Sequence, residues 1–237
     1  MNQFRKIKVV GAGGIGSYLI EPLSRYLSYC KDSCEITVID GDLYEDKNLQ
    51  RQKFSLSQKG ESKSKATVNQ YKDEFEKIHF KHKSEYLTEE NIISLIREDD
   101  VIFLCVDNHA TRKLVSDRCD QLKNVALISG GNDYTDGNVI CYIRKDGKNL
   151  TKSLTELDSK IANPEDKNPA EVNEAREGCQ QIVESQPQLL FMNLAIASMM
   201  LNCYRKFELD EIKFHQVYVD INTMRSRPSP EQQIELG

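Results

Sequence analysis

Apolar residues in the first half of the chain gather in short runs, and between the runs they recur at the spacing of a helix. Each run is bounded by glycine or polar residues, which is typical of a buried strand. The runs cover residues 7–10, 35–40, 100–107 and 125–129, and residues 78–83 predict a further strand. The helical spacing covers residues 14–29, 62–78, 87–97 and 108–122. Strands that alternate with helices predict a parallel sheet with right-handed crossovers.

The pattern changes in the second half of the chain. Residues 138–144 predict a further strand, and residues 214–221 alternate as a strand at a sheet edge does. Residues 188–204 predict an apolar helix that is buried nearly all round, and the polar residues 149–178 predict a long surface loop with about one helical turn. We therefore expect one α/β domain over residues 1–237. Its Rossmann-like, mostly parallel sheet has helices on both faces and an antiparallel C-terminal edge.

Composition narrows the class of protein. The chain has 237 residues, of which 39% are hydrophobic and 29% charged, as in an ordinary soluble protein. No stretch is long enough to span a bilayer and no signal peptide is evident, so we expect no membrane association and a cytoplasmic location. The net charge of −5 argues against nucleic acid as the main partner. The 7 cysteines include no Cys-x-x-Cys pair, which predicts free thiols and no structural zinc.

A glycine-rich segment carries the first chemical signal. Gly11, Gly13 and Gly16 form the pattern G-x-G-x-x-G directly after an apolar run and at the start of a helix, with Gly14 in the same turn. Glycine at these positions lets the backbone approach a phosphate at the positive end of the helix. Asp40 ends the next run, where its carboxylate can accept from ribose hydroxyls. The pattern predicts a nucleotide site but does not separate NAD from ATP.

The segment that follows Asp40 is more specific, because several motifs come after it in a fixed order. They are Asp-Gly-Asp at 40–42, Asn-Leu-Gln-Arg-Gln at 48–52, Lys-Ser-Lys-Ala at 63–66, Cys-Val-Asp-Asn-His-Ala-Thr-Arg at 105–112, Leu-Ile-Ser-Gly-Gly at 127–131 and Gly-Asn-Val at 137–139. Together with the glycine pattern, they resemble the ThiF/MoeB/HesA family, the bacterial relatives of ubiquitin-activating enzymes. The resemblance covers residues 6–144 well and residues 188–204 loosely.

The side chains in these motifs suit adenylation, in which a carboxylate attacks the α-phosphate of ATP and pyrophosphate leaves. The protein must align the reactants and neutralise the charge of the triphosphate. Arg51 and a lysine can supply positive charge, and Asn48 can act as a neutral donor. Asp107 ends a central strand, where a carboxylate can hold Mg²⁺ against the phosphates. Each residue also has a simpler interpretation: Arg51 as a solvated charge, and Asp107 as a helix cap.

The resemblance implies the same roles, with ATP and Mg²⁺ as cofactors and Asp40 on the ribose. Two lysines compete for the phosphate role. Lys65 precedes an alanine as the family's lysine does, while Lys63 follows Gly60 at a spacing that also fits, and we favour Lys65. A solvated Lys65 is the simpler alternative. The expected nucleotide-binding residues are Gly11, Gly13, Gly14, Gly16, Asp40, Asp42, Asn48, Arg51, Gln52, Lys63 and Lys65, and the expected catalytic residues are Arg51, Lys65, Asp107 and Cys179.

The sequence also departs from that family. Many members carry a helix before the first strand that supplies an arginine to the partner subunit, whereas Arg5 is the only early arginine here. Cys179 ends the polar loop, and in several members the comparable loop presents a cysteine that forms a thioester or takes part in sulfur transfer. A plain free thiol is the alternative for Cys179, because reactivity needs an environment that lowers the pKa of the thiol.

These observations lead to one main hypothesis about function. The resemblance implies an ATP-dependent adenylyltransferase that activates the C-terminal carboxylate of a small ubiquitin-like (β-grasp) or sulfur-carrier protein and works as a homodimer. An NAD-dependent oxidoreductase is the first alternative, since the glycine pattern and Asp40 permit it. A relative of the same family that acts on tRNA or a peptide, and a non-catalytic partner subunit, are the others.

Overall fold

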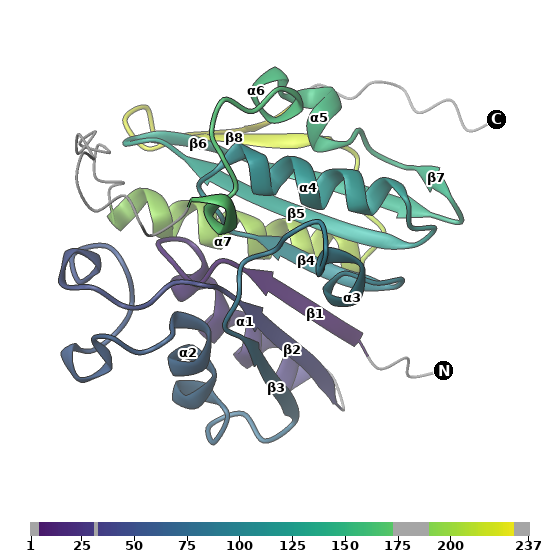
Figure 1. The fold of residues 1–237 in the computed structure, drawn as a ribbon. Helices are drawn as coiled ribbons and strands as arrows, with labels where there is room; N and C mark the ends of the chain where they lie inside the picture. Colours follow the sequence, from purple (N-terminus) through teal and green to yellow (C-terminus); the bar gives the residue numbers. More distant parts are fainter. Residues whose placement is uncertain (1–4, 31–32, 173–189, 230–237) are drawn as a thin grey trace.

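The computed structural model describes residues 5–30, 33–172 and 190–229, in which one sheet forms the centre of the molecule (Figure 1). Its strand order is β3-β2-β1-β4-β5-β6-β8-β9, and the short β7 pairs with β6. Strands β1 to β5 are parallel, whereas β5, β6, β8 and β9 pair in antiparallel fashion. The strands are β1 (Arg5–Val10), β2 (Cys34–Ile39), β3 (Ile78–Lys83), β4 (Asp100–Leu104), β5 (Val125–Asn132), β6 (Asp136–Lys145), β7 (Lys148–Asn149), β8 (Gln216–Asp220) and β9 (Arg225–Pro228). The predicted fold class, including its antiparallel C-terminal edge, is confirmed.

Helices cover both faces of this sheet (Figure 1). They are α1 (Gly16–Cys30), α2 (Lys63–Tyr71), α3 (Ile92–Leu95), α4 (His109–Asp120), α5 (Leu154–Leu157), α6 (Ser159–Ala162) and α7 (Leu190–Glu208), with 3-10 turns η1 (Asp46–Asn48), η2 (Leu56–Gln58) and η3 (Pro169–Glu171). One core lies between the sheet and the helices α1 and α7, and a second lies between the sheet and the helices α3 and α4. In the part of the chain that the structure describes, no helix combines the length and apolar character that crossing a bilayer requires.

The polar segment after β7 differs from the predicted loop. Residues 150–171, here named the strap, contain two short helices and the turn η3 rather than one helical turn. Leu154 and Ile161 are fully buried in the second core, and their helices α5 and α6 contact α4. Thr151 accepts a hydrogen bond from the backbone N–H of Ile143 and donates one to the carbonyl of Cys141, which fixes the start of the strap to β6. The strap is therefore part of the packed domain, and its polar composition misled the prediction.

Three predicted helices also need correction. The helix predicted over residues 62–78 ends at Tyr71, and the one predicted over residues 87–97 is reduced to the single turn α3. Asp99 has a φ of 63°, in the left-handed region, so the chain has already left helical geometry before β4. Helix α7 is not buried all round, because Phe191 is 66% exposed and Leu194 is 40% exposed. Some of the apolar residues of α7 therefore lie on the side of the helix that faces outward.

Candidate active site

A cleft with a volume of about 710 Å³ opens at the carboxyl ends of β1, β2, β4 and β5. Strand β1 pairs with β2 on one side and with β4 on the other, so the order of the strands along the chain reverses here. Open α/β sheets bind their ligands at such a reversal, because the loops on either side of it diverge. The walls of the cleft come from the loops after these strands, from the β5–β6 hairpin and from the strap.

The glycine loop after β1 packs closely against the backbone around it. Gly11 has a φ of +90°, and a Cβ there would lie 2.8 Å from the carbonyl oxygen of Cys105. A Cβ on Gly16 would lie 1.9 Å from the carbonyl oxygen of Gly11, a distance that no side chain permits. Both positions need glycine for the packing of the chain itself, so they alone do not indicate a ligand.

Gly13 lines the cleft and has a different environment. A Cβ on Gly13 would have as its nearest neighbour the Gln52 side-chain nitrogen, at the ordinary contact distance of 3.7 Å. The protein's own packing therefore does not require glycine at this position, whereas a phosphate against the loop would. Gly14 has no room for a side chain, because a Cβ there would lie 2.7 Å from the side-chain amide of Asn193.

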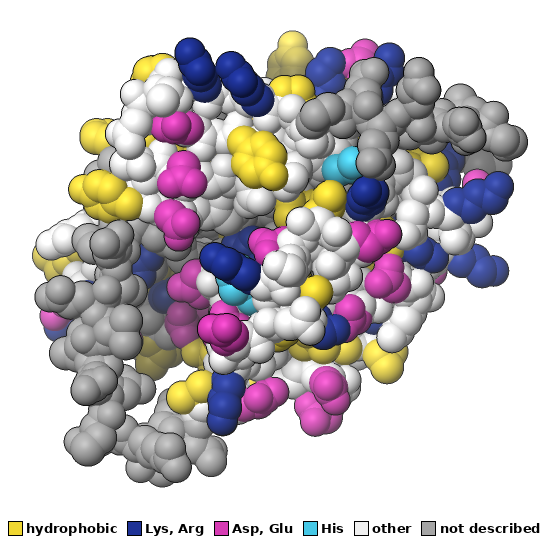
Figure 2. Space-filling view, turned by 90° about the horizontal axis from the view of Figure 1, so that it is seen from above, with side chains coloured by type: hydrophobic (Ala, Val, Ile, Leu, Met, Phe, Trp, Pro, Cys, Tyr) yellow, Lys and Arg dark blue, Asp and Glu magenta, His cyan; other side chains and the backbone are white. Residues whose placement is uncertain are grey.

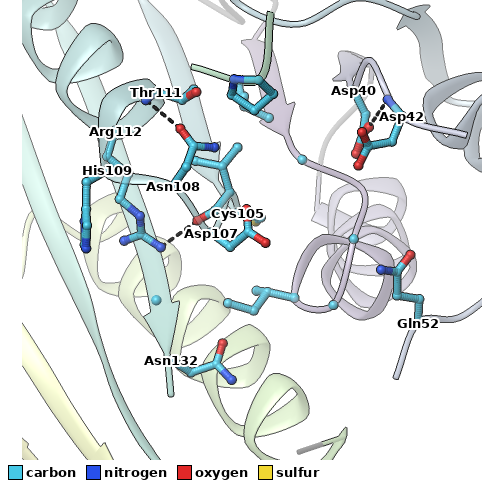
Figure 3. Close-up of a pocket in the computed structure, with 18 of the residues that line it drawn as sticks. Asp40, Asp42, Gln52, Cys105, Asp107, Asn108, His109, Thr111, Arg112 and Asn132 are labelled. Carbon is cyan, nitrogen blue, oxygen red and sulfur yellow. Dashed lines mark hydrogen bonds between the residues drawn. The ribbon is translucent and has the colours of Figure 1, made fainter. Parts of the chain in front are cut away.

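Asp40 connects the glycine loop to the end of β2. One oxygen of its carboxylate accepts from the backbone N–H of Ala12 at 2.6 Å, and the other accepts from that of Asp42 at 2.8 Å (Figure 3). Burial raises the pKa of Asp40, and the nearby Lys63 ammonium opposes this rise. A carboxylate accepts up to about four hydrogen bonds, so Asp40 retains capacity for a pair of hydroxyl groups.

Lys63 lies in the wall of the cleft and pairs with the second aspartate of the motif. It is buried, and its ammonium lies 2.8 Å from a carboxylate oxygen of Asp42. Tyr86 donates its hydroxyl proton to the other oxygen of Asp42. Burial alone would raise the pKa of Asp42, but the Lys63 charge and these hydrogen bonds lower it. Lys65, the residue that the sequence favoured, is exposed and lies outside the cleft wall, so of the two lysines it is Lys63 that lines the cleft.

The Asn-Leu-Gln-Arg-Gln segment forms the next part of the wall. Asn48 is buried, and its side-chain oxygen accepts from the backbone N–H of Glu45, which stabilises the turn η1. Arg51 is partly exposed and lines the cleft. Gln52 is buried on the same wall, and its side-chain oxygen has no hydrogen-bond partner within the described residues. An unsatisfied buried amide oxygen facing a cleft is a position where a ligand or a water molecule can donate.

Asp107 faces these residues from the end of β4. Figure 3 shows Asp40 and Gln52 on one side of the cleft and Asp107 with Asn108 on the other. The side chain of Asn108, not that of Asp107, caps α4 by accepting from the N–H of Thr111 at 2.8 Å. The interpretation of Asp107 as a helix cap is therefore wrong. Its carboxylate is exposed and makes no hydrogen bond or ion pair within the described residues.

Arg112 lies behind Asp107 and holds the ends of two strands together. Its guanidinium is buried and donates to the carbonyl oxygens of Val106 at 2.6 Å and Gly130 at 2.8 Å. Burial lowers the pKa of Arg112, and the charge of Asp107 raises it. Arg112 belongs to the sequence motif at 105–112, but no role was predicted for it. Its contacts hold the backbone at the ends of β4 and β5 together.

Two further features bear on the predicted site. Asn193 of α7 donates to the carbonyl of Arg51 at 3.4 Å and accepts from the side chain of Asn132 at 3.2 Å. Sequence reasoning missed Asn193, although a fully buried asparagine in an apolar helix was a signal that could have found it.

Cys179 lies outside the described residues. The cleft therefore brings together every predicted nucleotide-binding residue except Gly16, which packs against the backbone of Gly11, and Lys65.

A doubly wound sheet with a glycine loop, an acidic strand end and a cleft at the strand-order reversal defines a nucleotide-binding protein of the Rossmann-like class. A family model described as the ThiF family matches residues 2–234. The chain therefore belongs to the ThiF family, and the resemblance seen in the sequence is confirmed.

Among relatives, the chain is 34% identical over 137 residues to adenylyltransferase and sulfurtransferase MOCS3-2 of Zea mays, which covers 57% of this chain and 27% of that protein. It is 30% identical over 135 residues to adenylyltransferase and sulfurtransferase uba4 of Pyricularia oryzae, covering 56% of this chain and 26% of that protein. The matches thus span about a quarter of the length of these curated relatives.

Solved structures show the same fold at lower identity. The crystal structure of E. coli MccB with ATP has a TM-score of 0.69 and 18% identity, covering 98% of this chain and 65% of that chain. The structure of PaaA has a TM-score of 0.65 and 18% identity, covering 96% of this chain and 64% of that chain.

Proposed function

We propose that this protein is an ATP-dependent adenylyltransferase that activates the C-terminal carboxylate of a small ubiquitin-like or sulfur-carrier protein and releases pyrophosphate. The observation that carries the proposal is the arrangement of the cleft, in which Asp40, Arg51, Lys63 and Asp107 surround the glycine loop. Membership of the ThiF family and the names of the MOCS3-2 and uba4 relatives support it. Association of two copies of the chain, and a cytoplasmic location, belong to the same proposal.

Different residues of the cleft contact the ribose and the phosphates of the nucleotide. Asp40 accepts from the ribose hydroxyls, and the backbone around Gly13 lies against the phosphates. Arg51 and Lys63 supply positive charge to the triphosphate, with Lys63 held in place by its ion pair with Asp42. These groups act by position and charge, because a carboxylate nucleophile is already ionised at neutral pH and needs no base.

The donor set of the cleft fits a magnesium ion. The described residues contain no cluster of three or more metal-binding side chains that could hold a metal by themselves. Magnesium in nucleotide sites is bound by one or two carboxylates together with phosphates and water, so one exposed carboxylate suffices. Asp107 is that carboxylate. When bound, the ion would neutralise phosphate charge during the reaction.

In the proposed reaction, an oxygen of the acceptor carboxylate forms a bond to the α-phosphorus of ATP. The bond from the α-phosphorus to the bridging oxygen breaks, and the electron pair leaves with pyrophosphate. The cations of the cleft stabilise the negative charge that accumulates on the departing pyrophosphate. The products are the acyl adenylate and pyrophosphate.

Ligand-induced thermal stabilisation tests the nucleotide assignment. We expect ATP with Mg²⁺ to raise the unfolding temperature, because a ligand at about a hundred times its dissociation constant adds about 2.7 kcal/mol to the free energy of unfolding. NADH at the same concentration should have no such effect. Stabilisation by NADH without any response to ATP would replace the proposal with an oxidoreductase.

The two lysines of α2 provide a matched pair of variants. We expect Lys63→Gln to weaken ATP binding about tenfold or more, because it removes a buried cation that faces the cleft. Lys65→Gln, an exposed position two residues along the same helix, should bind ATP as the parent protein does. Calorimetric titration of both variants measures the difference, and equal losses in the two would contradict the register that the structure gives.

A further inference from the structure

The described wall of the cleft carries more negative than positive side chains. Eight carboxylates line it, against five lysine and arginine side chains. Figure 2 shows acidic and basic side chains side by side on the face that the strap helices form. A triphosphate that enters such a cleft is repelled unless cations face it, so each lysine or arginine able to reach the phosphates has a large influence on binding.

Four of the five cations already interact with the protein. The Lys47 ammonium lies 2.6 Å from Glu45, and Lys63 is paired with Asp42. The Arg112 guanidinium is buried against carbonyl oxygens, and Arg51 also has an interaction within the chain.

The fifth cation is Lys160, on helix α6 of the strap. Its side chain is exposed at the wall of the cleft, and its ammonium makes no hydrogen bond or ion pair with any residue that the structure describes.

The strap holds Lys160 at a defined position. The backbone N–H of Lys160 donates to the side chain of Asp158 at 2.8 Å, which caps α6, and the next residue, Ile161, is buried in the second core. Further along, Asp166 accepts from two backbone N–H groups at the start of α4, at 2.7 and 2.8 Å. Asn168 donates to the carbonyl of Leu87 at 2.8 Å. Lys160 is therefore a flexible side chain on a fixed backbone.

This part of the strap lies beside Asp107. Asp158 of the strap lines the cleft together with Asp107, and Asp166 of the strap accepts from the backbone N–H of His109, two residues after Asp107, at 2.7 Å. In Figure 1, α6 and α2 lie on opposite sides of the central strands. Lys160 on α6 and Lys63 on α2 line the same cleft, and Asp107 lines it with them.

We propose that Lys160 is a substrate-binding residue whose ammonium contacts the polyphosphate of the nucleotide from the strap side of the cleft. The inference rests on the proposed function, because it requires ATP as the ligand. It adds a residue that lies outside every motif that indicated the nucleotide site, on a segment that the sequence predicted to be a surface loop.

Calorimetric titration of the full chain with ATP and Mg²⁺, and separately with adenosine, tests the proposal. We expect Lys160→Gln to weaken ATP binding about tenfold and to leave adenosine binding unchanged, because adenosine has no phosphate. Lys160→Arg keeps the positive charge and should restore most of the affinity for ATP. Lys167→Gln is the matched control, since Lys167 is exposed on the same strap but lies outside the cleft wall.

The outcomes separate this inference from the proposed function. If the parent protein binds ATP and Lys160→Gln binds it equally well, the role of Lys160 is overturned and the adenylyltransferase proposal stands. If Lys160→Gln weakens ATP and adenosine alike, the residue acts on the shape of the cleft and the phosphate contact is wrong. If the parent protein does not bind ATP, both proposals fall.

Discussion

Replacement of Asp107 by asparagine is expected to reduce ATP–pyrophosphate exchange by about 10²–10³-fold, the range found when one preorganised electrostatic group is removed from an active site. The carboxylate is the exposed acidic group at the end of β4, and asparagine keeps its size while removing its charge. A neutral amide holds Mg²⁺ more weakly than a carboxylate does. The measurement is the incorporation of labelled pyrophosphate into ATP in the presence of the acceptor protein.

The fold should be unaffected by this change, because the Asp107 carboxylate makes no hydrogen bond within the described residues. Asp117→Asn is the control: Asp117 lies on α4, where it pairs with Lys113 at 2.6 Å at the surface. We expect that variant to retain full exchange activity. Retention of more than about a tenth of the activity in Asp107→Asn would move the metal-binding role to another carboxylate.

Replacement of Arg112 by methionine is expected to destabilise the protein by about 3 kcal/mol, the upper range for buried polar groups left without a partner. The carbonyl oxygens of Val106 and Gly130 would lose the donor that now lies 2.6 and 2.8 Å away. For a domain of this size, the unfolding temperature should fall by about 6–12 °C. Urea or thermal unfolding followed by circular dichroism measures the change.

Arg112→Lys separates charge from geometry. Lysine keeps the positive charge but lacks the planar guanidinium whose Nη2 donates to both carbonyl groups, so we expect most of the destabilisation to remain. If both variants unfold within about 0.5 kcal/mol of the parent protein, the range of an ordinary surface substitution, the two hydrogen bonds do not stabilise the strand ends.

The order of motifs was sufficient to predict the fold class and most of the cleft, because the glycine loop, Asp40 and Asp107 sit at the ends of strands that the apolar runs define. The motifs did not predict which side chains of a helix face the cleft. Lys63 and Lys65 are separated by about 200° around the axis of α2, so only one of them can face the cleft. Ser62 caps α2 and makes Lys63 its first residue, a detail that the motif alone did not supply.

Long-range contacts account for what the sequence did not predict. The strap looked like a loop because polar residues surround Leu154 and Ile161, yet these two side chains are enough to anchor it in the second core. Asn193 contacts the backbone of Arg51, and Lys160 lines the cleft, each from a segment far from the nucleotide motifs. Their place in the site depends on how α7 and the strap pack, which local pattern does not encode.

The anchoring of the strap also bears on how ligands enter and leave. Lifting the strap would expose Leu154 and Ile161, at a cost of about 1.5–3 kcal/mol for each side chain, or about 3–6 kcal/mol together. Fewer than about one molecule in a hundred would have the strap open at any moment. Nucleotide exchange through the open mouth of the cleft does not have to wait for this rare event. Opening of the strap then does not limit the rates of association and release.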